Sequence, residues 1–189
     1  MRITRAIGVG MLGWIAFLGA ARGAAAPLQT AGDRGAAVRI FATRVEQYAW
    51  LRARFEQPLP TFDADRRRWS LLLMRRYLAS AIRTARARET QENVFAPPID
   101  GFFRETIGDA IYDIDIEGLV DDGAEDPVDV MVNEPLPEWA LHPVPPALLE
   151  RLPPVPGAIS YKMAAGALVL WDDHAEIVID ALPDAFVTR

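Results

Sequence analysis

Cysteine is absent from this chain, and only two of its 189 residues are histidine. Without cysteine the protein can form no disulfide, and no thiolate can act as a nucleophile or as a metal ligand. Its stability must therefore come from packing and hydrogen bonding. The two histidines, His142 and His174, leave little scope for imidazole chemistry.

The motifs of the common enzyme classes are missing as well. After residue 26 serine occurs only as Ser70, Ser80 and Ser160, and none of them stands in a G-x-S-x-G nucleophile elbow. The chain also lacks the glycine fingerprints of phosphate-binding and dinucleotide-binding loops. Acidic residues are numerous, so a hydrolase that uses a pair of carboxylates stays open as the weakest alternative. On balance the sequence favours a protein that is not an enzyme.

Lysine is nearly absent, so the positive charge is carried almost entirely by arginine. Residues 27–95 hold 13 arginines and 7 acids, a net charge of +6, whereas residues 96–189 hold 4 basic residues and 19 acids, a net charge of −15. We expect these two parts of the chain to pair with each other, because arginine forms bidentate ion pairs with carboxylates. The overall charge of −6 argues against binding to nucleic acid.

The first 26 residues have the pattern of a cleavable export signal. Arg2 and Arg5 precede an uncharged apolar stretch, Ala6 to Leu18, and small residues follow up to Ala26. The stretch is shorter than the roughly 20 residues that span a bilayer, and no later segment is apolar enough to cross one. We therefore predict a periplasmic or secreted protein without a transmembrane segment in the mature chain, folded as a single domain over residues 27–189.

Three helices are predicted in the first half of that domain, over 33–57, 63–88 and 97–112. Each carries apolar residues at intervals of three and four, and Pro58 and Pro60 separate the first helix from the second. Such a short connection predicts an antiparallel helix pair. We expect Trp50 and Trp69 to help seal the helical layer, since large aromatic side chains bury much area.

The second helix is rich in arginine on the face opposite its apolar stripe. This face could bind an anion or a partner protein, although pairing with the acidic half of the same chain is the simpler interpretation. A helix that lies on a membrane surface would be expected to carry lysines. The arginines that we expect to face a partner are Arg68, Arg75, Arg76 and Arg83.

An acidic and proline-rich connection follows over residues 113–157, with one possible strand at Val128 to Val132. Its first part resembles a calcium-binding loop, but the twelfth position, normally a bidentate glutamate, is Ala124. A solvated acidic loop explains the same residues, so calcium is only a possible cofactor. The candidate metal ligands are Asp113, Asp115, Glu117 and Asp121.

The C-terminal part predicts an antiparallel β-meander over residues 158–182. Its runs at 158–163, 167–171 and 176–181 are rich in β-forming residues, and the intervening segments read as turns. Along the last run we expect Ile177 and Ile179 to face one way, and Val178 and Asp180 the other. Helices followed by a meander indicate an α+β fold, in which the helix pair and third helix pack on the small sheet.

Five stretches of the chain carry a resemblance to known proteins: RVEQYAWL, AIRTARARETQENVF, VNEPLP, VPPALLERLPPVP and ISYKMAAGALVLWDDHAEIVIDALPDA. Together they resemble a family of uncharacterised exported bacterial proteins. The resemblance covers roughly residues 36–185, and it implies no activity, cofactor or site residues. The hairpin alone is also similar in shape to that of small periplasmic nickel and cobalt homeostasis proteins, without any metal ligand.

Taken together, these features predict an exported envelope protein that acts as a binding module for a partner such as another envelope protein. A module that responds to calcium or a transition metal through the acidic loop is the alternative. His174, in the sequence WDDHAE, is expected to lie in a solvent-exposed turn, because neighbouring residues on a strand point to opposite faces and seldom converge on a metal.

Overall fold

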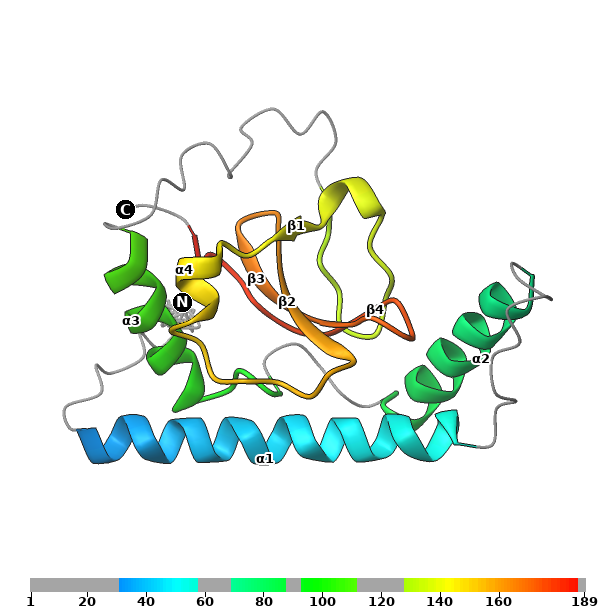
Figure 1. Ribbon diagram of the computed structural model, residues 1–189, viewed down its shortest axis with the longest axis horizontal. Helices are drawn as coiled ribbons and strands as arrows, with labels where there is room; N and C mark the ends of the chain where they lie inside the picture. Colours follow the sequence, from blue (N-terminus) through cyan, green and yellow to red (C-terminus); the bar gives the residue numbers. More distant parts are fainter. Residues whose placement is uncertain (1–30, 58–68, 88–92, 112–127, 187–189) are drawn as a thin grey trace, which may run out of the picture.

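The computed structural model describes residues 31–57, 69–87, 93–111 and 128–186 (Figure 1). It has a mixed α+β fold, as predicted, in which helices pack on a four-stranded antiparallel sheet. No helix within these ranges is long and apolar enough to cross a membrane. The elements are α1 (Ala31–Glu56), α2 (Trp69–Ala85), α3 (Ile99–Ile111), the 3-10 helix η1 (Glu138–Ala140), β1 (His142–Pro143), α4 (Pro146–Leu149), β2 (Ile159–Ala164), β3 (Ala167–Asp172) and β4 (Ile177–Leu182).

The helix pair is more open than the sequence predicts. In Figure 1, the axis of α2 is steeply inclined to that of α1, near the C-terminal end of α1. Only the C-terminal half of α2 lies close to the rest of the protein. Burial follows the same division, since Leu78 and Ile82 are buried whereas Leu72, Leu73 and Tyr77 are exposed. Apolar spacing therefore identified the helix, but the N-terminal half of α2 projects instead of packing along α1.

The strands run in the order β1-β2-β3-β4, and each pairs antiparallel with its neighbour. Strands β2 and β3 are joined by the two residues Ala165 and Gly166, which have φ angles of 47° and 72°. Two consecutive residues with positive φ are typical of the type I′ turn, whose twist suits a tight hairpin. Strands β2 and β3 thus form a tight hairpin, and β4 extends it to the predicted meander. Each of the three strands begins and ends within one residue of its predicted position.

A β-bulge in the last strand pair changes which way one acid points. Leu170 pairs with Asp180, but the next residue, Trp171, pairs with Val178, so Ile179 is the extra residue. Asp180 consequently lies on the same side of the sheet as Ile179, where it is fully buried and accepts bonds from the backbone nitrogens of Val94 (2.6 Å) and Phe95 (2.8 Å). The expectation that Asp180 faces the other way from Ile179 is therefore wrong.

The larger core lies between the helices and one face of the sheet. Phe41 of α1 is its centre, with ring centroids 5.0 Å from Phe103 of α3 and 6.3 Å from Tyr161 of β2. Ile82 of α2 and Leu148 of α4 complete the contact from either side and are fully buried. The proline-flanked segment at α4 thus packs into the domain.

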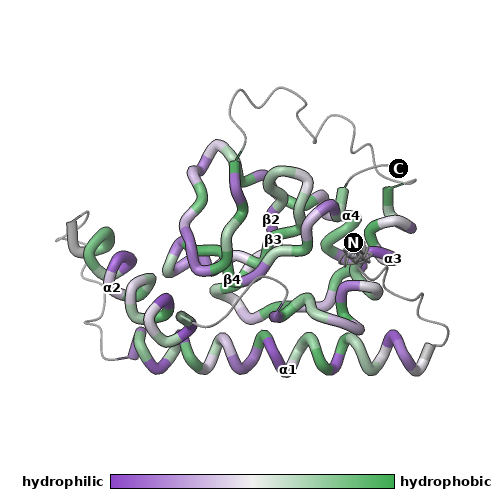
Figure 2. The backbone as a smooth tube through the Cα atoms, turned by 180° about the vertical axis from the view of Figure 1, so that it is seen from behind, coloured by the Kyte–Doolittle hydropathy of each residue, from purple (hydrophilic) through white to green (hydrophobic). Residues whose placement is uncertain are grey.

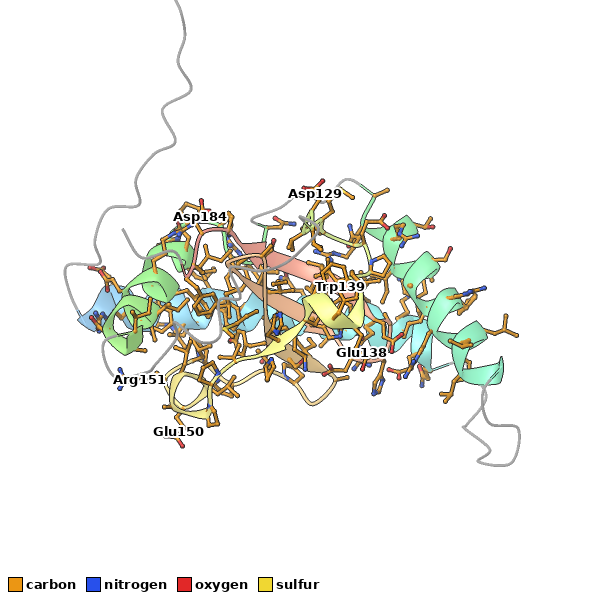
Figure 3. The ribbon with its side chains drawn as sticks, turned by 90° about the horizontal axis from the view of Figure 1, so that it is seen from above. Asp129, Glu138, Trp139, Glu150, Arg151 and Asp184 are labelled. Carbon is orange, nitrogen blue, oxygen red and sulfur yellow. The ribbon has the colours of Figure 1, made fainter. Side chains whose placement is uncertain are left out.

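The opposite face of the sheet is covered by irregular chain. Val169, Trp171 and Val178 form a second, smaller cluster, against which the segment 128–141 packs. No strand forms at Val128–Val132, contrary to the prediction; instead the nitrogen of Asn133 donates to the oxygen of Val178 (2.8 Å), whose own nitrogen donates to Glu134 (3.0 Å). Figure 3 shows Trp139, on η1 of this segment, which is exposed.

Trp50 does not seal the helical layer. It lies on the face of α1 opposite to the core and is 66% exposed, so this prediction is wrong. The spacing explains why: Phe41, Val45 and Tyr48 define the buried stripe, and position 50 falls half a turn away from it. The side chain of Trp69 lies outside the described residues.

Candidate functional site

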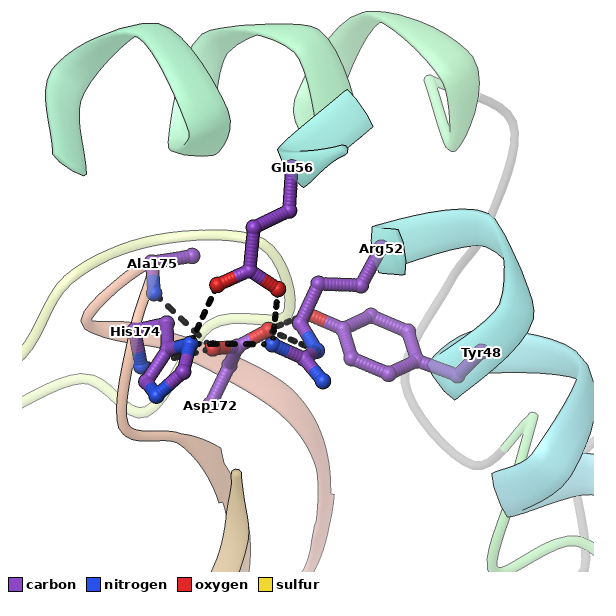
Figure 4. Close-up of polar contacts among 6 residues, drawn as sticks. All are labelled: Tyr48, Arg52, Glu56, Asp172, His174 and Ala175. Carbon is purple, nitrogen blue, oxygen red and sulfur yellow. Dashed lines mark hydrogen bonds and ion pairs between the residues drawn. The ribbon is translucent and has the colours of Figure 1, made fainter. Parts of the chain in front are cut away.

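Three polar side chains form a row at the C-terminal end of α1. Tyr48, Arg52 and Glu56 follow one another at intervals of four residues, so they share one face of the helix on successive turns. This row continues the buried stripe of α1 and faces the turn between β3 and β4 (Figure 4). Helix and turn together build a polar cluster, which consists of Tyr48, Arg52, Glu56, Asp172 and His174.

Asp172, the last residue of β3, is the centre of the polar cluster. Its carboxylate is fully buried, and one oxygen accepts hydrogen bonds from the backbone nitrogens of His174 (2.9 Å) and Ala175 (2.8 Å). The other oxygen accepts a bond of 2.6 Å from the hydroxyl of Tyr48 and lies 3.8 Å from Nε of Arg52. A buried carboxylate needs such partners, because its desolvation is costly without them. The side chain thereby fixes the turn and attaches it to α1.

The outer part of the polar cluster is a chain of contacts from Arg52 through Glu56 to His174. NH1 of Arg52 donates to Oε2 of Glu56 at 2.6 Å, and Oε1 of Glu56 lies 2.5 Å from Nδ1 of His174. Because the ionised carboxylate of Glu56 can only accept, we assign the imidazole proton to Nδ1, which donates to Glu56. NH1 of Arg52 lies 3.1 Å from the same nitrogen but can only donate, so its bond is the one to Glu56. This assignment leaves Nε2 as the open ring nitrogen of His174, whose side chain is 52% exposed.

The hydroxyl of Tyr48 is a hydrogen-bond donor in this arrangement and keeps its proton. Burial raises the pKa of its hydroxyl well above the ordinary value, and the negative charge and hydrogen bond of Asp172 raise that pKa further. The guanidinium of Arg86, 5.1 Å from the centre of the Tyr48 ring, opposes this rise. The hydroxyl therefore stays neutral at physiological pH and is unsuited to act as a nucleophile or base.

The chemistry open to the polar cluster is limited. Most of its polar atoms bond to one another or to the backbone of the turn. Among the described residues, the buried Nε of Arg52 has no hydrogen-bond partner, since the Asp172 carboxylate lies 3.8 Å from it. Among the residues described, no group of three or more histidine or acidic side chains could hold a metal ion. The arrangement fits a clamp between α1 and the β3–β4 turn. The sequence placed His174 in a turn but gave no sign of the buried Asp172.

The arginines of α2 fall into two groups. Arg75 pairs with Glu176 at 2.6 Å, and Arg83 pairs with Glu134 at 3.1 Å and also donates to the backbone oxygen of Asn133. These pairs join the basic half of the chain to the acidic half, as expected. Arg76 is exposed and forms no ion pair within the described part of the chain.

Just beyond α2, Arg86 is buried and anchors the chain there. Its guanidinium donates to Oδ1 of Asn133 (2.8 Å) and to the backbone oxygen of Ile179 (3.0 Å). Together with Leu78 and Ile82 it fixes the C-terminal half of the helix.

The projecting half of α2 presents an apolar surface. Leu72, Leu73 and Tyr77 are 42%, 64% and 52% exposed, and Arg76 lies among them, four residues after Leu72 and three after Leu73. We call these four residues the α2 outer face. In Figure 2 this end of α2 carries apolar colour although it stands away from the body of the protein.

The remaining candidate residues lie outside the part of the chain that the structure describes. These are Arg68 and the four candidate calcium ligands Asp113, Asp115, Glu117 and Asp121. The structure therefore neither brings the acidic loop together nor separates its residues.

Comparison with known proteins adds no family. No protein-family model, no curated protein and no solved structure matches the chain. The resemblance to exported bacterial proteins remains a prediction, and function has to be argued from the described geometry.

Proposed function

We propose that this protein is an exported, non-enzymatic binding module of the cell envelope, and that it holds a partner protein on the α2 outer face. The observation that carries the proposal is the exposure of Leu72, Leu73 and Tyr77 on adjoining turns of one helix. Single exposed apolar residues are ordinary, but a contiguous group with a polar rim is typical of an interaction surface. Tyrosine and arginine, which are both present there, are enriched among residues that dominate binding energy.

The support from the rest of the chain is of two kinds. The N-terminal pattern of Arg2, Arg5 and the apolar stretch up to Leu18 favours export, and the chain has no thiol that an oxidising compartment would convert to a disulfide. The polar cluster offers no nucleophile, since the hydroxyl of Tyr48 stays neutral and donates to Asp172, which favours binding over catalysis. The calcium-responsive and hydrolase alternatives remain predictions that no contact of the described residues supports.

Site-specific photo-crosslinking tests the proposal. A photoreactive phenylalanine is placed at Leu73, at Tyr77 and, as a matched control, at Thr84, which is exposed on the anchored half of the same helix. In cells that produce the full chain, we expect a discrete adduct with one protein from positions 73 and 77 and none from position 84. Equal adducts at all three positions, or no adduct anywhere, would contradict the proposal. Unchanged melting temperatures would show that the variants are folded.

A further inference from the structure

We infer, resting on the proposed function, that the partner docks on the α2 outer face through an amphipathic helix whose apolar residues flank a carboxylate. The inference starts from the charges of α2, which contains three arginines and no acid over its 17 residues. Arg75 and Arg83 are held by Glu176 and Glu134. Arg76 is therefore the one guanidinium of this helix that is available to an incoming group, as far as the described residues show.

The position of Arg76 specifies what surrounds the incoming acid. Leu72 lies one turn before it, and Leu73 and Tyr77 lie on its other side, so Arg76 projects from the helix between exposed apolar residues. A carboxylate that meets it must be carried among apolar side chains that cover these neighbours. Removal of water around such a pair strengthens the hydrogen bonds between guanidinium and carboxylate. The chemistry that fits is thus a leucine-rich surface with an aspartate or glutamate at its centre.

The shape of the surface favours a helix as the carrier of that acid. The α2 outer face spans six residues, about 9 Å along a convex helical ridge at the usual rise per residue. Side chains of a second helix fit between such ridges. Addition of a strand to the sheet is less suitable, because Asn133 and Glu134 already occupy the outer edge of β4 at Val178. Strand β1, at the other edge, is two residues long and contains Pro143.

Two other occupants are disfavoured by charge. In a symmetric pair of copies the same patch would meet itself, and Arg76 would approach the Arg76 of the second copy. An anionic membrane surface attracts clusters of basic residues, whereas this face offers one available arginine on a chain with a net charge of −6. A single acid on a protein partner satisfies the same arginine without that conflict.

The test uses the full chain with the photoreactive residue at Leu73 and varies Arg76. We expect the adduct yield to be largely retained in Arg76→Lys and to fall at least about tenfold in Arg76→Gln and Arg76→Glu, as for loss of a hydrogen bond to a charged group. Thr84→Glu, which lowers the net charge by one on the anchored half, as Arg76→Gln does on the outer face, should leave the yield unchanged. Sequencing of the crosslinked partner peptide should find an acid flanked by apolar residues at helical spacing.

The outcomes separate this inference from the proposed function. If the adduct forms but its yield is the same in all Arg76 variants, or if the partner peptide contains no acid, the inference of an acid-bearing helix is wrong. The α2 outer face would then still be the docking surface. If no adduct forms at Leu73, the proposed function itself fails. Flotation with phosphatidylglycerol vesicles provides the last arm: binding of the purified full chain that Arg76→Gln abolishes would overturn the inference in favour of a lipid surface. An adduct with a second copy of the chain would also overturn it.

Discussion

The hydroxyl of Tyr48 provides the sharpest test of the polar cluster. It donates its hydrogen bond to a fully buried carboxylate, that of Asp172, over 2.6 Å. The hydroxyl of Tyr161 is almost as buried but donates to a neutral acceptor, the backbone oxygen of Pro153, over 2.9 Å. The variants Tyr48→Phe and Tyr161→Phe thus remove one hydroxyl each from comparable surroundings and differ chiefly in the charge of the acceptor.

The magnitudes follow from that difference. A hydrogen bond to a charged group contributes about 1.5–3 kcal/mol to the free energy of unfolding, and a neutral one about 0.5–1.5 kcal/mol. We therefore expect Tyr48→Phe to cost about 1 kcal/mol more than Tyr161→Phe. Phenylalanine keeps the ring on which the Arg86 guanidinium lies, 5.1 Å from its centre, so this contact should survive and not add to the loss.

Urea unfolding at neutral pH measures both losses, provided that the slope of free energy against urea is unchanged. A double-mutant cycle with Asp172→Asn isolates the pair and should give a coupling energy above about 0.5 kcal/mol. Equal losses for the two tyrosine variants, or a coupling near zero, would refute the assignment of Asp172 as a charged acceptor that depends on Tyr48.

Three further outcomes can be measured on the same protein. Burial raises the pKa of both Tyr48 and Tyr161 in the folded state, so their stabilising effect is complete below the unfolded value of about 10. This stabilising effect is lost as the pH rises further, so the free energy of unfolding should fall by about 1.4 kcal/mol per pH unit for each tyrosine. In Tyr48→Phe the slope of that fall should be halved, and an unchanged slope would contradict the burial of the Tyr48 hydroxyl. Calorimetry should show that Ile82→Ala costs about 2–5 kcal/mol, whereas Leu73→Ala stays within about 0.5 kcal/mol; a similar loss for both would mean that the outer face of α2 is packed. Ala165, with its φ of 47°, should be improved by Ala165→Asn, which tolerates this conformation; a lower melting temperature would argue against the type I′ turn.

The sequence predicted the elements well where local pattern determines them. Helices α1 and α3 begin and end within two residues of the predicted positions, and so do the three strands of the meander, because apolar period and turn residues act over short distances. The order of the elements was then enough to predict the α+β class. The 17 described residues of α2 fall within the predicted range.

The errors concern relations between distant segments. Apolar spacing shows that a helix has a stripe but not whether another element covers it, which is why the exposure of Leu73 and Trp50 was missed. A bulge shifts side-chain direction by one residue, and nothing in the run around Asp180 signals it. The polar cluster joins Tyr48 to Asp172, 124 residues later, so its existence depends on the packing of α1 against the sheet.

The outer edge of β4 has a consequence for how this protein behaves in concentrated solution. The backbone groups of Val178 are bonded to Asn133 and Glu134, and the oxygen of Ile179 is bonded to Arg86. An open edge strand is a template on which other chains add to a growing sheet, and such growth leads to aggregates. At these positions the template is already occupied by the chain itself. We therefore expect resistance to fibril formation at this edge. Arg86→Ala removes the bond to the oxygen of Ile179 and should weaken that resistance.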